Sequence, residues 1–422
     1  MFFYKNYSQG RTRSRARRRA GRGHPLPQPG RVPPGSRRRA RASQGYLGVL
    51  ADLAMPGDLA DLERATARNV VTRSLKVRPG ESVMIESWSH TLPLASAIVD
   101  EARRVGGIPL LLLEDETAYW NAVDRKQTRL LGRMSRSEQA AVRAADVFVM
   151  FWGPGDSQRF EQLDAKASDE VTAWNDPWYA LARTSHLRGL RMGFGFATES
   201  NARLWGTTVE RARREILAAS GVDPALLAKA GSRLRRSLQG RRRLRIRHAN
   251  GTDLELRLAG RPGELSTGVP GRSTPRRPYG MLTGLPDGKF AIPLEGSTAE
   301  GTLLANLPTW TPWWRHAGGR WDFHEGRLTE FSFDQGGEKF RQRFGEGTAG
   351  KDRPGALQFG LNPALRSIPT MHTSQGGVVS LQVGRNIGFG GTNRSTFLDW
   401  VSLAGADVTV DGSPLLRGGR FL

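Results

Sequence analysis

Three side chains in the C-terminal half of the sequence are the strongest candidates for chemistry. Lys289 follows the turn "LPDG", and a lysine in a cleft could hold a carboxylate or an oxyanion or, with a lowered pKa, act as a base or an imine-forming amine. His372, in "SIPTMHTSQGG", precedes a strand in a polar loop and is the best free imidazole for proton transfer. Asp399 interrupts an apolar stretch and could be its partner. We therefore expect Lys289, His372 and Asp399 to be the catalytic residues.

Each candidate also has a structural interpretation. Lys289 could be a solvated lysine at the edge of a cleft. Asp399 could be an acid at the surface or at a sheet edge, because a shift of one residue in strand register turns a side chain to the other face. Further residues are expected to bind substrate: Trp400, Trp313, Trp314, Glu295 and Asn393. The tryptophans between residues 310 and 321 would form either an aromatic wall for a flat or peptidic ligand or a hydrophobic plug between domains.

Several common signatures are missing from the 422 residues. The absence of cysteine excludes disulfides, thiolate zinc sites and cysteine nucleophiles, and it fits a cytoplasmic protein. The turns "GPGD" at 153 and "GFGF" at 193 lack the dinucleotide-binding fingerprint, and neither a P-loop nor a G-x-S-x-G elbow occurs. We therefore expect no cofactor. No stretch is long enough to span a membrane, so no membrane association is expected.

The net charge of +23 is unevenly distributed along the chain. Residues 1–54 contain twelve Arg and one Lys against one acid, Asp52, together with many Pro and Gly residues. Such a composition cannot bury enough apolar surface to fold, so we expect a disordered tail. It is a product of an early translation start, with Met55 as the true start, a polybasic arm, or a targeting segment. Nucleic acid is a partner only if this tail is real.

The elements that would position the candidate residues change character near residue 239. Residues 55–238 alternate helical patterns with strands, among them "SVMIES" and the continuously apolar "IPLLLLE", which is typical of a parallel sheet covered on both faces. Residues 239–422 begin with a β-hairpin that turns at Asn250 and Gly251 and continue in short strands. The sequence predicts a doubly wound α/β domain over 55–238 and a strand-rich α+β domain with the cleft over 239–422.

Several segments within residues 56–422, taken in order, resemble one family, the metallo-aminopeptidases of the aminopeptidase T and aminopeptidase S type, to which 2,5-dihydroxypyridine dioxygenases are related. The segments are "SLKVRPGESVMI", "HANGTDLELRLAGR", "LPDGKFAIPLEGSTAEGTLLAN", "FGLNPAL", "GGVVSLQVGRNIGFGGT" and "VTVDGSPLLRGGRF". The resemblance implies an N-terminal α/β domain, a C-terminal domain that holds a metal cleft, and a homodimer.

The resemblance ends at the family's metal ligands. The positions that would hold Glu, Glu, His, Tyr, His and Asp correspond to Lys289, Ala356, Ser380, the neighbourhood of Ile387, Leu398 and Trp400. Methyl, isobutyl and indole groups offer a divalent ion no donor, and an ammonium group repels it. We therefore expect no metal.

Three functions remain open from the sequence. The first is a repurposed, metal-independent enzyme of natural-product metabolism that acts on a small peptide or an aromatic amino-acid derivative. The second is an inactive pseudoenzyme that serves as a binding or scaffold subunit, as a homodimer or a heterodimer with a paralogue. The third is a metal-dependent aminopeptidase or ring-cleaving dioxygenase with rearranged ligands.

Overall fold

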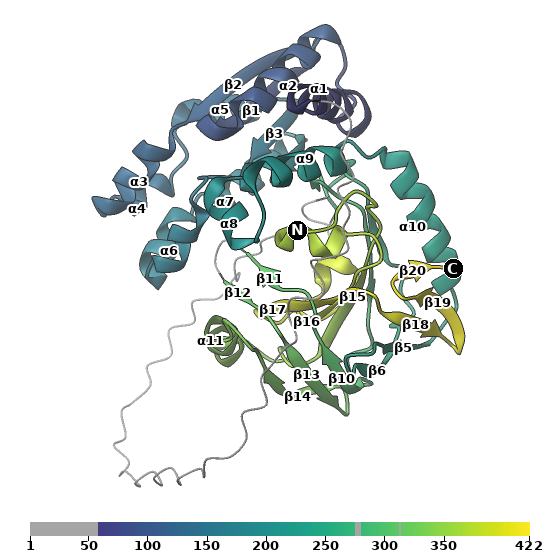
Figure 1. Cartoon of the computed structure of the whole chain (residues 1–422). Helices are drawn as coiled ribbons and strands as arrows, with labels where there is room; N and C mark the ends of the chain where they lie inside the picture. Colours follow the sequence, from purple (N-terminus) through teal and green to yellow (C-terminus); the bar gives the residue numbers. More distant parts are fainter. Residues whose placement is uncertain (1–57, 275–279, 312–313) are drawn as a thin grey trace, which may run out of the picture. The chain divides into compact units, whose positions relative to one another are not determined.

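The computed structural model describes residues 58–274, 280–311 and 314–422 (Figure 1). The Arg-rich segment 1–54 and Trp313 lie outside these residues. Within the described ranges, no helix combines the length and the apolar character needed to cross a bilayer.

The first sheet is parallel and has the strand order β2-β1-β3-β4-β8. Its strands are β1 (Ser82–Trp88), β2 (Ile108–Glu114), β3 (Val147–Phe151), β4 (Arg188–Met192) and β8 (Leu282–Leu285). The chain crosses from β1 to β2 on one side and then returns to place β3 on the other side of β1. The prediction of a doubly wound parallel sheet is confirmed, and its topological switch point lies between β1 and β3.

Helices cover both faces of this sheet. On one face, α1 (Leu59–Arg68), α2 (Leu92–Arg104) and α9 (Val209–Ser220) bury Ala67, Ile98 and Ile216 against alternate strand residues. On the other face, α5 (Arg136–Ala144) and α7 (Asn175–Thr184) bury Val142 and Trp178. The apolar residues of α1, α2 and α9 recur at helical spacing in the sequence, and this spacing marks the buried sides of these helices. The shorter helices are α3 (Glu116–Asp124), α4 (Thr128–Leu131), α6 (Ala165–Val171) and α8 (Glu199–Leu204).

The sheet is covered on both faces as predicted, but the run "IPLLLLE" forms its edge and not its centre. β2 is the edge strand of the sheet, and Ile108, Leu110 and Leu113 are 63%, 46% and 55% exposed. A continuous apolar run is typical of a central parallel strand, but strand order depends on the crossovers and not on the run itself.

The second half of the chain forms two antiparallel sheets and a short ribbon, as the strand-rich pattern predicted. The larger sheet contains β14 (Arg327–Ser332), β13 (Arg320–His324), β10 (Glu300–Leu304), β6 (Asp253–Arg257), β5 (Arg243–Arg247), β18 (Asp407–Val410), β19 (Ser413–Arg417) and β20 (Arg420–Phe421), in this order. The five-stranded sheet contains β17 (Leu398–Leu403), β16 (Val379–Gly384), β15 (Pro354–Gly360), β9 (Lys289–Pro293) and β7 (Glu264–Ser266). The ribbon pairs β11 (Thr309–Trp310) with β12 (Arg315–His316).

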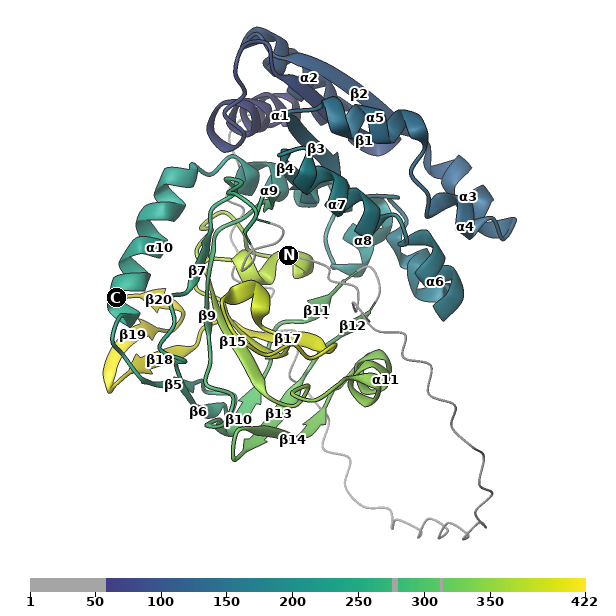
Figure 2. The same cartoon turned by 180° about the vertical axis from the view of Figure 1, so that it is seen from behind.

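One apolar core lies between the two antiparallel sheets. Ile246 and Leu254 of the predicted hairpin β5–β6 contribute from one side, and Leu381 and Val401 contribute from the five-stranded sheet. α10 (Pro224–Leu238) packs against β7 and β9 and is seen beside them in Figure 2, and α11 (Glu338–Glu346) adds Phe340 to the core. The face of the five-stranded sheet that points away from this core is the one that carries Lys289.

Candidate functional site

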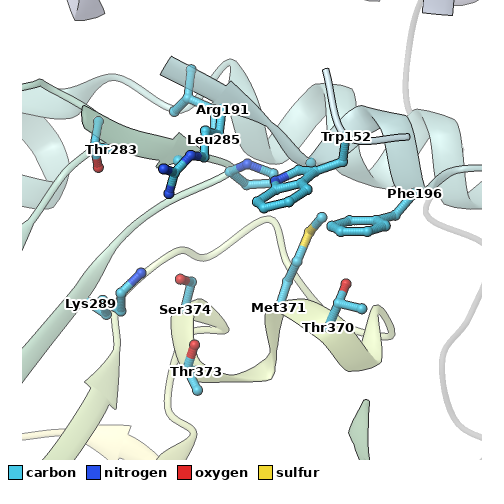
Figure 3. Close-up of a pocket in the computed structure, with 13 residues that line it drawn as sticks. Trp152, Arg191, Phe196, Thr283, Leu285, Lys289, Thr370, Met371, Thr373 and Ser374 are labelled. Carbon is cyan, nitrogen blue, oxygen red and sulfur yellow. The ribbon is translucent and has the colours of Figure 1, made fainter. Parts of the chain in front are cut away.

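A small cavity contains Lys289 and lies where the two halves of the chain meet. It has a volume of about 40 Å³ and is situated beyond the carboxyl ends of β3, β4 and β8, with the 3-10 helix η5 (Pro369–Ser374) on the opposite side (Figure 3). Ligands of open α/β sheets bind beyond the carboxyl ends of the strands. The space can hold a carboxylate-sized group but not a whole peptide.

Lys289 is held by a buried carboxylate. Its side chain is 9% exposed, and its ammonium group donates to Asp287 Oδ1 over 3.0 Å. Asp287 Oδ2 accepts hydrogen bonds from Thr283 Oγ1 at 2.8 Å, from the backbone N–H of Gly268 at 3.1 Å and from Ser266 Oγ. Burial alone would raise the pKa of Asp287, but the charge of Lys289 and these hydrogen bonds act in the opposite direction and hold it below its ordinary value. The alternative of a solvated lysine at a cleft edge is therefore wrong.

The rest of the cavity lining is basic, polar and aromatic. Arg191 at the end of β4 is a second cation, and no Asp or Glu occurs among the described lining residues. Trp152 and Phe196 stack with ring centroids 5.6 Å apart and 17° between their planes. Figure 3 shows the hydroxyl of Ser374 on the same side as the Lys289 ammonium group. Asp287 pairs with Lys289 from outside the lining, so an anion in the cavity would meet Arg191, the further N–H donors of Lys289 and the hydroxyl groups.

A close backbone contact explains one glycine of "GFGF". A Cβ at Gly195 would lie 1.8 Å from the carbonyl oxygen of Trp152, a distance that no side chain tolerates. Glycine therefore allows the 3-10 helix η4 (Gly193–Phe196) to pack directly on the end of β3, which brings Phe196 against the indole ring.

His372 is not the free imidazole that the sequence predicts. It is 4% exposed, and its Nδ1 lies 3.2 Å from the carbonyl oxygen of Pro308. Burial lowers the pKa of His372 to about 4, and the hydrogen bond to Pro308 opposes this shift only in part. The polar segment forms the buried turn η5, in which Met371 and Thr373 line the cavity and His372 does not. It is therefore a neutral histidine that donates from Nδ1 to a carbonyl.

The strand register decides the position of Asp399. β16 and β17 pair without a shift, so that Asp399 lies opposite Val383. Because alternate residues of a strand point to opposite faces, Asp399 shares the apolar core face with Val383 and Val401, whereas Leu398 and Trp400 lie on the face of Lys289. The slip of one residue that would bring this carboxylate beside Lys289 does not occur.

Asp399 is also not a surface or edge acid, because it is fully buried and has three partners. His316 Nε2 lies 3.2 Å from Oδ1, the backbone N–H of Trp400 donates to Oδ1 at 2.7 Å, and Arg343 Nη1 donates to Oδ2 at 2.8 Å. Burial alone would raise the pKa of Asp399, but His316, Arg343 and this N–H hold it below its ordinary value. The Arg343 guanidinium carbon also lies 3.6 Å from a ring centroid of Trp314. This group of charges fixes β17, β12 and α11 together.

The residues that the sequence resemblance assigns to the family's ligand positions do not fit a divalent ion. The pairing register places Lys289, Ala356, Ser380, Leu398 and Trp400 on one face of the five-stranded sheet. The oxygen or nitrogen atoms among these side chains are an ammonium, an indole N–H and one hydroxyl, and they cannot supply the several lone pairs that such an ion requires. Elsewhere in the described residues, no group of three or more His, Asp or Glu side chains could hold a metal.

Of the described residues that were expected to bind substrate, Trp314 lines a cavity. Trp400 is 7% exposed and is absent from the lining of either cavity. Glu295 is exposed beyond the far end of β9 from Lys289, and the Asn393 amide donates to the carbonyl of Gly350 at 2.8 Å. Among the other tryptophans of this region, Trp310 and Trp321 are buried in two separate apolar cores, so they form neither a shared aromatic wall nor a single plug between domains.

A larger crevice adjoins the small cavity, with which it shares Trp152, Arg191 and Phe196. Its volume is about 880 Å³, and Trp314 and Glu86 are among the residues that line it. Burial is the main reason why the pKa of Glu86 is raised to about 8, and the negative charges of Glu138 and Glu114 add to this effect.

The partners of Lys289 and Asp399 were not predicted from the sequence. Asp287 precedes Lys289 by two residues in "LPDGK", a spacing that places both side chains on one side of an extended segment, so this signal was available. Arg191, His316 and Arg343 had no comparable signal, because they reach the site from distant segments.

Comparison with known proteins places this geometry in a known architecture. No family model matches the chain, and no curated protein does. Wild-type AmpT from Thermus thermophilus superimposes with a TM-score of 0.66 and 16% identity over 86% of this chain and 100% of that chain. The chain has an aminopeptidase-T-like fold. 2,5-Dihydroxypyridine dioxygenase from Pseudomonas putida KT2440 shares it with a TM-score of 0.54 and 15% identity over 87% of this chain and 98% of that chain. Similarity at this level of identity supports the fold and leaves the activity open.

Replacing Asp399 tests its structural role. We expect Asp399→Ala to lower the free energy of unfolding by about 3–5 kcal/mol, because it leaves His316 and Arg343 without their shared carboxylate. Asp61→Ala is the control: it removes an exposed pair with Arg64 and should cost less than about 1 kcal/mol. Urea denaturation measures both, and equal losses would contradict the role of Asp399.

Glu86 makes the stability depend on pH. Its folded pKa of about 8 lies above the unfolded value of 4.5, so its contribution is complete below pH 4.5 and is lost as the pH rises through 8. We expect the stability difference between Glu86→Gln and wild type to rise by roughly 2–4 kcal/mol from pH 5 to pH 8. Urea denaturation at both pH values measures it, with the exposed-residue variant Glu210→Gln as a control that should show no such rise.

Proposed function

We propose that the protein binds, without turning it over, a small peptide or an aromatic amino-acid derivative whose carboxylate group enters the small cavity. The observation that carries this proposal is the lining of the small cavity. Among its described residues are Lys289, Arg191 and several side-chain hydroxyl groups, and no Asp or Glu. A carboxylate bound there would gain charge-assisted hydrogen bonds in a site of low water content, where they are stronger than at the surface.

Lys289 is well prepared to bind such an anion. One of the three N–H groups of its ammonium is used in the pair with Asp287, and the others can donate to a bound anion. Trp152, Phe196 and Met371 would contact the part of the ligand next to the carboxylate.

The arrangement of the other candidates favours binding over catalysis. His372 is committed to the carbonyl of Pro308, and Asp399 lies on the opposite face of the sheet among His316 and Arg343. A general base and its orienting group must lie within hydrogen-bond reach of each other and of the reacting group. Lys289, His372 and Asp399 do not meet this condition together. Of the functions left open by the sequence, we therefore favour the non-catalytic binding subunit.

Replacing Lys289 tests the proposal with a matched pair of ligands. We expect wild-type protein to bind 3-phenylpropionate and to bind the uncharged 3-phenylpropanol much more weakly. Lys289→Met should weaken the dissociation constant for the carboxylate by roughly 10- to 100-fold, because a charge-assisted hydrogen bond is lost. The measurement is isothermal titration calorimetry, with Lys229→Met on the surface of α10 as the control.

A further variant separates loss of binding from loss of folding. Lys289→Met leaves Asp287 buried without its cation, whereas the double variant Asp287→Asn/Lys289→Met removes both charges and should fold more stably. We expect the double variant to remain unable to bind the carboxylate. Undiminished affinity in either variant would contradict the proposed site.

A further inference from the structure

The larger crevice occupies the position at which doubly wound sheets bind ligands. Its lining includes the last residues of β1 and β3, the two strands between which the strand order reverses. Carboxyl ends of strands diverge at such a switch point and leave a crevice. Lys289 is not among the residues that line this crevice, so its ligand can be considered separately from that of the small cavity.

Glu86 projects into this crevice from the middle of an apolar surface. It pairs in the sheet with Leu112 of β2 and Met150 of β3, and all three residues line the crevice. Arg191 follows next to Met150 on the same face, two strand spacings from Glu86, which is roughly 10 Å. Among the described residues, no side chain or backbone group forms an ion pair or a hydrogen bond with the Glu86 carboxyl group.

Ionising the Glu86 carboxyl group in the free protein is energetically unfavourable. Burial and the charges of Glu138 and Glu114 raise its pKa to about 8, so that it is largely protonated at neutral pH. The other charged or titratable groups that line the crevice are Tyr119, Arg133, Glu161, Asp164, Asp169, Tyr179, Arg191, Lys339, Arg343 and Glu346. A cation beside Glu86 would relieve the repulsion among the three carboxyl groups and restore the charged form.

Aromatic rings provide the second feature that fits a cation. Rings from several elements line the crevice: Trp88, Tyr119, Trp152, Trp174, Trp178 and Trp314. The faces of such rings attract ammonium groups, and the rings also bury flat or apolar ligand bodies. A cluster of carboxyl groups surrounded by aromatic rings is suited to an organic cation and not to a hydrated metal ion.

We propose that the crevice at the switch point binds an aromatic or apolar primary amine whose ammonium group pairs with Glu86. The volume of about 880 Å³ accommodates a small organic molecule with room to spare. Binding the ammonium group converts Glu86 from the acid to the carboxylate, so one proton leaves the protein for each amine bound.

The proton release gives the proposal a measurable signature. We expect isothermal titration calorimetry with 2-phenylethylamine to show an affinity that increases by at least tenfold from pH 6 to pH 8. Titrations at pH 6.5 in buffers of different ionisation enthalpy should show the release of nearly one proton. The uncharged 2-phenylethanol should bind at least tenfold more weakly at pH 8. Equal affinity for the amine and the alcohol would overturn the proposal.

Two variants complete the test. Glu86→Gln keeps the shape of the side chain and should weaken amine binding at pH 8 by at least tenfold and abolish its pH dependence, whereas Glu210→Gln should change neither. Lys289→Met should leave amine binding intact, so that failure of the amine site and failure of the carboxylate site are read separately. An unchanged affinity of Glu86→Gln for 2-phenylethylamine would exclude Glu86 as the partner.

Discussion

The pairing register of the five-stranded antiparallel sheet determines which side chains the cleft contains. Because alternate residues point to opposite faces, β17 can present either Leu398 and Trp400 or Asp399 to the side of Lys289, but not both. In the register that forms, Leu398 and Trp400 lie on the face of Lys289, and Asp399 is buried on the other face. The cleft is therefore left with one cation from this sheet, and its polar character comes from the ends of the parallel strands and from η5.

Buried charge in this protein is mostly matched, and the exceptions point to ligands. Asp287 and Asp399 both lie deep in the structure, and each has an excess of donors that keeps it ionised. Lys289 has one such partner and remains open to the small cavity. Glu86 lacks a described partner altogether. A carboxylate bound at Lys289 or an ammonium group bound at Glu86 would supply a partner of opposite charge in addition to those of the protein.

Local patterns predicted the elements, whereas the site depended on contacts that no local pattern contains. The helical spacing around Ala67 and Ile98 and the hairpin turn at Gly251 were readable because their signals lie within a few residues. The exposure of β2 follows from the strand order of the whole sheet. The partners of Asp399 lie 56 and 83 residues away in sequence, and a buried turn directs His372 away from the cavity. Lys289, His372 and Asp399 therefore lie in three separate environments.

The contact between Gly195 and Trp152 has a consequence for how this site can vary. Any other residue at position 195 would force the backbone of η4 away from β3 before it altered a single ligand contact. The stacked rings of Trp152 and Phe196 line both cavities, so such a change would alter the lining of both at once. Substitutions that change ligand preference should therefore occur among the surrounding side chains, while position 195 should remain glycine.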